Sequence, residues 1–438
     1  MEKLHSILLK AKSCVGCTHC VKNCPTKAIR VHNGKAKIKN EYCIDCGECI
    51  RSCNYHAKYA QGGKFAAIND YKYPVALIPS SFYGQFKDDI KVEKIAIALK
   101  ELGFKSLRNI SEGENILEQA KADYINQQNE TVISSSCQTV TRLIKLLYPE
   151  LLDYLLPFKP PEEILADKVR YELSLEKDLS AEDIGIFLIT ACPAKLTAVD
   201  NPLDIEESSL DGAIAVDNIY RRLLEQVNEI KDLDNFSKLK EEEKPYLYQN
   251  SDLKIERSIN VTGLNNVISV LEEMSRENLS TVKVLNLLAC KAGCFGGVLN
   301  VKNPHLAKFN HKNIFKDKIK DVQISYEQEK ITLPLEFKEN VVNPLDNDIL
   351  SAMNKLNKME NVVDSLPKLD CAACGAPDCQ TLAEDIVNDL ANKYDCIFIL
   401  RQEVADLADE MARLAHEIPP IMKSNSRKGD ETESKKDN

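Results

Sequence analysis

Cysteines are the residues whose type and spacing most directly indicate chemistry in this 438-residue chain. There are sixteen of them, in four groups of four, and none is left over. A disulfide framework is not expected in a long cytosolic chain, so metal ligation by thiolates is the favoured interpretation. The groups are Cys14, Cys17, Cys20 and Cys24; Cys43, Cys46, Cys49 and Cys53; Cys137, Cys192, Cys290 and Cys294; and Cys371, Cys374, Cys379 and Cys396.

The stretch TVKVLNLLACKAGCFGGVLN, residues 281–300, holds two of the central thiols. Its apolar and β-branched residues predict a buried strand that ends at Cys290, followed by a turn through several glycines. Cys290 and Cys294 have C-x3-C spacing, and the glycines let the backbone approach closely. This arrangement suits a bulky soft-metal cluster better than a tetrahedral zinc ion.

Two cysteine runs near the N-terminus have the spacing of bacterial ferredoxins. Residues 14–25, CVGCTHCVKNCP, match C-x2-C-x2-C-x3-C-P, and residues 43–53, CIDCGECIRSC, repeat the run with Asn54 in the place of proline. In two-cluster ferredoxins the fourth cysteine of each run ligates the other cluster. The expected ligands of the two 4Fe-4S clusters are therefore Cys14, Cys17, Cys20 and Cys53 for one, and Cys43, Cys46, Cys49 and Cys24 for the other. Two zinc sites are the alternative, although zinc modules rarely place three thiols two residues apart.

The last group of cysteines has the spacing C-x2-C-x4-C-x16-C over residues 371–396. Its first three thiols lie in a Gly/Pro loop, and residues 380–393 are predicted to form a helix that lets Cys396 fold back toward them. A fourth 4Fe-4S cluster is expected here, with zinc as the alternative. Residues 403–418 are predicted to form a further helix, and residues 423–438 a polar, disordered tail.

Alternating strand and helix patterns from about residue 60 to 350 predict an α/β domain. Predicted strands at 131–134, 183–190 and 281–290 each deliver a cysteine to a following loop. Because open α/β sheets present ligands at the ends of their strands, the central thiols are expected at such strand ends. Residues 155–182 and 226–260 are charged and poorly patterned, and we interpret them as surface insertions or helix connections. The remaining predicted elements are a strand at 73–79 and helices at 92–102, 114–124 and 140–151.

Composition excludes several other classes of protein. The apolar content of 44% supports at least one large core, and the apolar runs are too short to span a membrane. No signal-peptide pattern is present, so a soluble cytoplasmic protein is expected. The net charge of −10 argues against a nucleic-acid binder. The first 60 residues carry 11 basic and 4 acidic residues, or +7, which is explained if anionic thiolate clusters lie inside.

A ferredoxin-like pair followed by three separated thiol motifs on an α/β body resembles the iron-only (FeFe) hydrogenases. The family motifs are matched by SSSCQTV (134–140), TACPAKLTA (190–198) and LACKAGCFGG (288–297). The resemblance implies an H-cluster, in which a 4Fe-4S cube is linked through Cys294 to a two-iron unit carrying CO, cyanide and a dithiolate bridge. It also implies that Lys195 hydrogen-bonds a cyanide ligand. The cube would be held by Cys137, Cys192, Cys290 and Cys294.

The resemblance covers nearly the whole chain and implies its domain organisation. Residues 1–62 would be a ferredoxin domain with two 4Fe-4S clusters, and residues 63–360 the α/β H-cluster domain. Residues 361–400 would hold the C-terminal 4Fe-4S module, with a helix and charged tail at 401–438. The implied substrates are dihydrogen and protons, and the implied protein partners are hydrogenase maturation proteins and a redox or signalling protein.

Several positions depart from the family pattern. The relay cysteine before the first ligand is Ser136, and a serine relays protons less well than a thiol with a reference pKa of about 8.5. Glu112 matches one relay glutamate, but the second is Asn115. For Ser136 the ordinary role would be a helix N-cap, and for Lys195 an exposed loop lysine. The motif positions of a tryptophan, a methionine and a glutamate hold Val140, Leu288 and Ala198.

These substitutions, with the C-terminal module, resemble the sensory branch of the family. The chain ends before the PAS domain that often follows in that branch, so its output is expected to pass to a separate partner. The resemblance thus implies a slow hydrogenase that serves as a hydrogen or redox sensor in an anaerobic setting. An electron-transfer protein with a plain 4Fe-4S cube in the central site, lacking hydrogenase activity, is the alternative.

Overall fold

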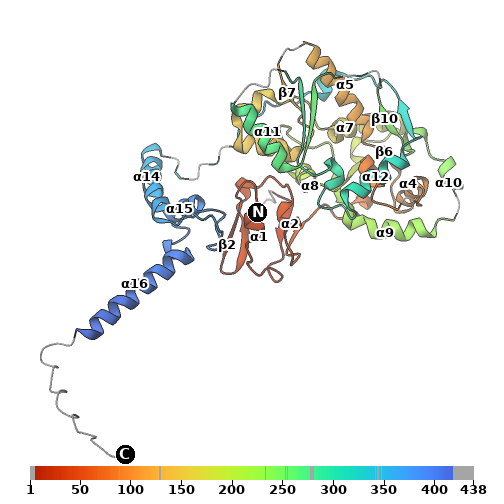
Figure 1. Cartoon of the computed structure of the whole chain (residues 1–438). Coiled ribbons are helices and arrows are strands. Elements are labelled where there is room, and N and C mark those ends of the chain that lie inside the picture. Colours follow the sequence, from red (N-terminus) through yellow and green to blue (C-terminus); the bar gives the residue numbers. More distant parts are fainter. Residues whose placement is uncertain are drawn as a thin grey trace, which may run out of the picture. The chain divides into compact units, whose positions relative to one another are not determined.

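The computed structural model describes residues 5–417, except residues 88, 128–129, 232, 252, 254, 277–280, 341, 343–344 and 347. The chain divides into two compact units, Met1–Val342 and Asn343–Asn438, whose elements are labelled in Figure 1. The predicted tail at 423–438 lies outside the described residues. None of the described helices is long and apolar enough to cross a membrane.

The N-terminal part of the first unit is built from two antiparallel strand pairs and two one-turn helices. Strand β1 (Ile7–Leu9) pairs with β4 (Lys58–Ala60), and β2 (Ile29–His32) pairs with β3 (Lys35–Ile38). Helices α1 (His19–Lys22) and α2 (Glu48–Arg51) occupy equivalent places in the two cysteine runs. The repeated sequence pattern therefore corresponds to a repeated local structure.

A four-stranded parallel sheet with the order β6-β5-β8-β9 forms the main core of the first unit. Every residue of β8 is buried, as expected for a strand covered on both faces. The predicted strands at 73–79 and 183–190 and the predicted helix at 92–102 are confirmed. The strands are β5 (Tyr73–Ile78), β6 (Ser106–Asn109), β8 (Ile184–Thr190) and β9 (Gly212–Ala215), and the adjoining helices include α4 (Val92–Glu101) and α9 (Val216–Glu229).

A smaller parallel sheet with the order β11-β12-β7 lies in the same unit. It comprises β11 (Ser258–Thr262), β12 (Val284–Leu288) and β7 (Val132–Ile133), which confirms the predicted strands at 131–134 and 281–290. Helices α6 (Gln138–Leu147) and α11 (Leu264–Arg276) pack their apolar faces on it. The three strands that precede the central cysteines therefore belong to two different sheets.

The segment at 155–182 is not a surface insertion, and that interpretation is wrong. It contains α7 (Pro161–Lys177), which buries Leu165 and Val169 in the main core and Ile164 in a neighbouring cluster. The glutamates in its first turn are also buried. Charged residues at the start of a helix can be buried when they have partners. The charge content of this segment was therefore not a reliable sign of exposure.

The rest of the first unit consists of shorter or peripheral elements. Strand β10 (Leu247–Gln249) pairs in parallel with β13 (Ile319–Asp321), so residues 226–260 also contribute ordered structure. The remaining helices are α3 (Ser80–Tyr83), α5 (Ser111–Gln127), α8 (Pro193–Asp200), α10 (Asp234–Ser237), α12 (Pro304–Ile314) and α13 (Gln328–Ile331). The 3-10 turns are Asn40–Tyr42, Phe65–Asp70, Pro149–Tyr154, Ala181–Asp183, Glu241–Glu243 and Gly293–Gly296.

The second unit is small and helical. Helix α14 (Ile349–Ser365) packs on α15 (Cys379–Val387) around a core that includes Leu366 and Leu382. A 3-10 turn at Lys393–Asp395 leads into α16 (Ile397–His416). The helix predicted at 380–393 is therefore shorter than expected, because Asp389 adopts a left-handed conformation just after its end.

Glu163 on α7 is a buried carboxylate whose ionisation should limit the stability of the first unit. It accepts hydrogen bonds from the Ser208 hydroxyl at 2.6 Å and the Ser209 N–H at 2.7 Å. Burial nevertheless raises the pKa of Glu163 from 4.5 to about 7. The folded state therefore binds its proton more tightly than the unfolded state does, so stability falls as pH rises from about 4.5 to 7.

Glu163→Gln should remove this loss, which is on the order of 3 kcal/mol above pH 7 if each pKa unit contributes 1.36 kcal/mol. Thermal unfolding followed by circular dichroism across this pH range should show a smaller decline in Tm for the variant. The exposed Glu225→Gln serves as the control. An identical pH dependence in wild type and Glu163→Gln would contradict this assignment.

Candidate metal centres

The structure brings Cys14, Cys17, Cys20 and Cys53 together around one small cavity in the N-terminal part. The fourth thiol comes from the second cysteine run, as the ferredoxin spacing predicts. Backbone N–H groups point at the sulfurs: Ala36 N–H donates to Cys14 Sγ at 3.4 Å, and Ala57 N–H donates to Cys53 Sγ at 3.2 Å. Such donors stabilise thiolate charge, and they favour an iron–sulfur cluster at this cavity.

Cys24, Cys43, Cys46 and Cys49 form a second neighbouring set. Burial raises the pKa of Cys46 well above its usual value, and the nearby Cys24 thiol adds to the effect. Burial likewise raises the pKa of Cys49 to about 12. The N–H of Ala28 donates to Cys24 Sγ at 3.2 Å. The Cys46 and Cys49 thiols would stay protonated at neutral pH unless a metal supplied positive charge, which fits this set to a metal cluster.

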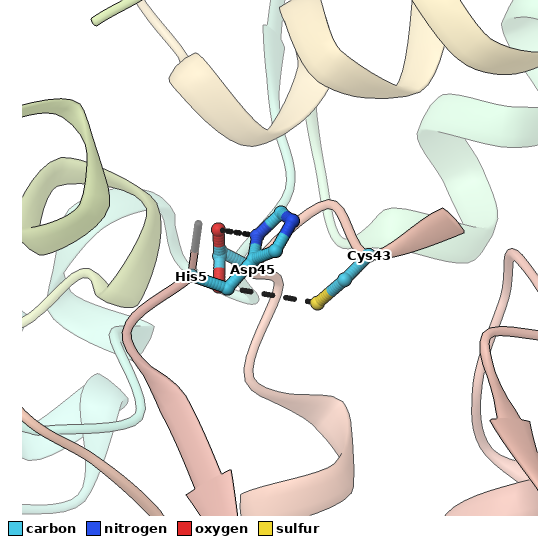
Figure 2. A group of neighbouring side chains, drawn as sticks. All are labelled: His5, Cys43 and Asp45. Atoms are coloured by element: carbon cyan, nitrogen blue, oxygen red, sulfur yellow. Dashed lines mark hydrogen bonds and ion pairs between the residues drawn. The ribbon is translucent and has the colours of Figure 1, made fainter. Parts of the chain in front are cut away.

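An imidazole and a carboxylate lie beside this second set (Figure 2). His5 Nδ1 is 2.6 Å from Asp45 Oδ2, and the Cys43 thiol is 3.9 Å from Asp45 Oδ1. Asp45 is fully buried, so its carboxyl group requires a hydrogen-bond partner, and the His5 ring supplies one. Sequence spacing did not indicate this pair, because His5 and Asp45 are 40 residues apart.

The central thiols all follow strand ends. Cys137 and Cys192 stand directly before α6 and α8, while Cys290 and Cys294 flank and enter the 3-10 turn at Gly293–Gly296. Two glycines hold the loops together. A Cβ on Gly296 would lie 1.9 Å from the Lys291 carbonyl oxygen, and one on Gly297 would lie 2.7 Å from the Ala191 carbonyl oxygen. Only glycine permits this approach, which brings the loop of Cys294 against that of Cys192.

Mutual electrostatic effects show that the central thiols are neighbours. Burial raises the pKa of Cys192 to about 11, and the Cys137 thiol raises it further. Burial also raises the pKa of Cys290 well above its usual value. The thiols of Cys192, Cys137 and Cys294 raise it further by electrostatic repulsion. Four such thiols would not ionise together without a cation, so their chemistry fits a cationic metal group.

Polar atoms near the central thiols are also consistent with a bound group. The side-chain oxygen Oε1 of Gln138, next to Cys137, is buried and has no hydrogen-bond partner among the residues that the structure describes. A buried acceptor without a partner is unfavourable in a closed protein interior. The residues present therefore fit a metal group that brings further polar contacts.

Lys195 is partly buried in a helix beside the central thiols, so the alternative of an exposed loop lysine is wrong. It lies in α8, its side chain is 16% exposed, and its Nζ is 2.8 Å from Glu162 Oε2. Burial acts to lower the pKa of Lys195, but Glu162 and the Cys294 thiol outweigh it and raise the pKa. The lysine thus carries a fixed positive charge in this pocket.

The carboxylates that lie near Lys195 do not include Glu112, the predicted relay glutamate. Glu112 pairs with Arg108 at 2.7 Å and with Lys168 at 3.7 Å. Instead, Glu114 interacts electrostatically with Lys195, although its side chain is exposed. The pocket carboxylates Glu114 and Glu162 were missed, since Glu162 lies in the segment interpreted as an insertion.

Ser136 lies directly before Cys137, and its hydroxyl contacts that of Ser134 at 2.9 Å. The N-cap residue of α6 is Cys137, which contributes no side-chain capping bond. The alternative role of Ser136 as the N-cap is therefore wrong. Its hydroxyl remains available for other hydrogen bonds at this strand end, because a hydroxyl has one donor and two acceptor sites.

The N-terminal part is fastened to the central thiol loops. Arg51, two residues before Cys53, donates to the Gly296 carbonyl at 2.9 Å. Ser6 donates through its hydroxyl to the Pro193 carbonyl at 2.8 Å and through its backbone N–H to Thr197 at 2.9 Å. Gly47 packs so closely on Val298 that an added Cβ would lie 2.5 Å from it. These contacts hold the second thiol set next to the central one.

The last thiol set lies in the second unit. Cys371, Cys374, Cys379 and Cys396 line one small cavity. Asp370 accepts a hydrogen bond from Cys379 N–H at 2.8 Å, and Asp378 accepts one from Thr381 N–H at 2.7 Å, which fixes the start of α15. Cys396 is returned to the cavity at the start of α16, as the spacing predicted.

Three family models match this chain. Residues 72–221 match the C-terminal domain of the iron-only hydrogenase large subunit. Residues 6–54 match a 4Fe-4S dicluster domain, and residues 366–398 match an Fe-S cluster domain. A search of curated proteins gave no match.

Solved structures of hydrogenases are also similar to this chain. A glutamate-to-alanine variant of the FeFe-hydrogenase HydA1 from Chlamydomonas reinhardtii has 12% identity, covers 62% of this chain and 95% of its own, and gives a TM-score of 0.49. A glutamate-to-glutamine variant has the same identity and coverage with a TM-score of 0.47. A HydA structure described as revealing stepwise H-cluster assembly has 13% identity, covers 56% and 85%, and gives 0.42.

Arg142 on α6 should tune the potential of a cluster at this site. Burial lowers the pKa of Arg142, while Asp45, Cys43 and Cys192 favour its charged form. Its Nη2 donates to the Asn201 carbonyl at 3.1 Å, and the guanidinium lies near thiols of both the second and the central sets. A positive charge so placed stabilises the reduced state of an adjacent cluster.

Arg142→Gln should therefore lower the reduction potential by about 60 mV, the equivalent of a tenfold change for one electron. An EPR-monitored redox titration of the reconstituted full chain measures it. Arg221→Gln, at a side chain that is 90% exposed, is the control. Equal potentials in the Arg142→Gln variant and wild type would exclude this role.

Proposed function

We propose that the chain splits or forms dihydrogen slowly at an H-cluster, a proposal supported by the match of residues 72–221 to the iron-only hydrogenase large subunit, C-terminal domain. The observation that carries the proposal is the gathering of Cys137, Cys192 and Cys290 beside a buried lysine. These thiols come from three strand ends in two sheets, so no single local motif explains their meeting. A structural zinc site would have no need of a buried ammonium group next to its ligands.

In this proposal Cys137, Cys192, Cys290 and Cys294 hold the 4Fe-4S cube, and Cys294 also joins the two-iron unit. When bound, the H-cluster supplies an open iron as Lewis acid and a bridge amine as base, so that dihydrogen is split heterolytically. Lys195 supports this assignment through its electrostatic interaction with Cys294. Its ammonium would donate a hydrogen bond to a cyanide ligand and offset the negative charge of the cluster.

The proton route is proposed to include Ser136 and the carboxylates near Lys195. Ser136 replaces a more acidic thiol, so proton transfer at this step is slow. Glu114 and Glu162 are better placed than Glu112 to continue the route, because both interact with Lys195 whereas Glu112 is held by Arg108. Slow turnover suits a hydrogen or redox sensor, whose signal would pass to a partner protein.

The electron route is proposed to run through the set Cys24, Cys43, Cys46 and Cys49. The contacts of Arg51 with Gly296 and of Ser6 with Pro193 support this, because they tie the N-terminal part to the loops that carry Cys294 and Cys192. The set Cys14, Cys17, Cys20 and Cys53 would exchange electrons with a redox partner. Together with the central cube and a cluster in the C-terminal set, these two clusters bring the proposed number of 4Fe-4S clusters to four.

One observation favours a second function, electron transfer by a plain 4Fe-4S cube in the central site. The ammonium group of Lys195 already has a carboxylate partner in Glu162 at 2.8 Å. This ion pair satisfies the buried lysine without a cyanide ligand. In that case the chain would bind four ordinary clusters and show no activity toward dihydrogen.

Infrared spectroscopy separates the two functions. The full chain, reconstituted with iron and sulfide and then treated with hydrogenase maturation proteins, should gain absorption bands of iron-bound CO and cyanide. Cys294→Ser should lose these bands and keep the EPR signals of the N-terminal clusters. A spectrum without CO and cyanide bands, from a chain with full iron content, would exclude the H-cluster and leave the electron-transfer function.

Ser136→Cys should raise the rate of hydrogen–deuterium exchange, because a thiol at this place transfers protons more readily near neutral pH. We expect an increase of roughly tenfold to 100-fold, at the lower end of what general acid–base groups contribute. Ser135→Cys is the matched control, since the Ser135 hydroxyl donates to the Phe158 carbonyl at 3.1 Å instead. A fast wild-type protein, or an unchanged rate in Ser136→Cys, would contradict the slow relay.

A further inference from the structure

Helix α16 presents a continuous apolar stripe that the described residues of the second unit do not cover. None of its residues is buried, and Figure 1 shows it as one uninterrupted helix. Six large apolar side chains on it are between 40% and 70% exposed at spacings of three and four residues. Scattered exposed apolar residues need no explanation, but a stripe along a 20-residue helix is a surface for another helix. The six are Ile397, Leu400, Val404, Leu407, Met411 and Leu414.

The residue types on this stripe follow the heptad rule of two-stranded coiled coils. With Ile397 at position a, the a positions hold Ile397, Val404 and Met411. The d positions are all leucine, at Leu400, Leu407 and Leu414. β-branched residues at a and leucine at d favour a parallel dimer over trimers and tetramers. A partner that offers the same a and d residues in register is another copy of this helix.

The flanking residues favour the parallel orientation. The g positions carry Glu403 and Glu410, and the e positions that follow them carry Ala408 and Ala415. In a parallel pair each glutamate faces an alanine of the other helix. In an antiparallel pair the g positions face each other, which would set Glu403 against Glu410 and cause repulsion. The opposite face of the helix is polar, and Gln402 donates to Asp406 there at 2.8 Å.

We propose that α16 pairs with α16 of a second copy of this chain in a parallel two-stranded coiled coil. The 20 residues give a short coil about 30 Å long, so the dimer depends on protein concentration. Cys396 stands directly before the first a position and lines the cavity of the last thiol set. A parallel pair therefore brings the C-terminal thiol sets of two chains to the same end of the coil.

This inference is independent of the hydrogenase proposal, because it rests on α16 alone. The test uses sedimentation-velocity centrifugation of the full chain at micromolar concentrations. The wild type should sediment as a dimer, with twice the mass of one chain. Val404→Glu/Met411→Glu places two charges at a positions and should yield a monomer. The matched control, Ala405→Glu/Ala412→Glu, adds the same two charges one residue further on, outside the stripe, and should remain a dimer.

Circular dichroism and the visible absorption of the clusters should be equal in both variants, which shows that folding is intact. A monomeric wild type overturns the proposal, whether the stripe then binds another part of the same chain or a different protein. A dimer that survives Val404→Glu/Met411→Glu also overturns it, since another surface would be responsible.

Orientation is tested with a photo-cross-linking amino acid in place of Leu414. In a parallel dimer, mass spectrometry should find it joined to the peptide around residue 414 of the other chain. Cross-links to the peptide around residues 397–400 would show an antiparallel pair and overturn the parallel arrangement.

Discussion

The cost of placing thiolate charge inside the protein governs much of the first unit. Burial holds the pKa values of Cys192 and Cys290 above neutral, so these groups keep their protons unless a metal pulls them off. The fold gathers thiols where strands end and helices begin, as Cys137 and Cys192 do directly before α6 and α8. Gly296 and Gly297 are needed at this place because the loop of Cys294 must press against that of Cys192. The metal site and the loop geometry therefore depend on each other.

Lysine and arginine side chains lie beside these sulfurs, although protonated thiols would not need positive charges next to them. Lys195 reaches the central set from α8, Arg142 stands near both the central and the second sets, and Arg51 reaches across to Gly296. Each comes from a different element, and each is held by an acceptor at a defined distance. Such fixed cations stabilise electrons that arrive on a cluster, so the arrangement suits redox chemistry better than purely structural metal binding.

The sequence predicted those features that depend on local spacing. A spacing rule predicts that Cys53 of the second ferredoxin run joins the thiols of the first run. Short apolar runs predict the strands before Cys137, Cys192 and Cys290. What it could not predict were the partners brought together by tertiary packing. Glu162 lies on a helix whose charges concealed its buried face, and no spacing rule connects it with a lysine 33 residues away. The pair of His5 and Asp45 was hidden for the same reason.

The carboxylates around Lys195 bear on which of the two functions the pocket serves. Lys195 is paired with Glu162, so part of its positive charge is already offset when a further anion lies in the pocket. Glu114 lies near the same ammonium group and near the Cys294 thiol, and it interacts electrostatically with both. Because its side chain is exposed, this carboxyl group can exchange protons with solvent as well as with the pocket. Electron transfer by a plain cluster has no use for a proton-exchanging carboxyl group at this place, whereas the making or splitting of dihydrogen requires a proton route to the metal.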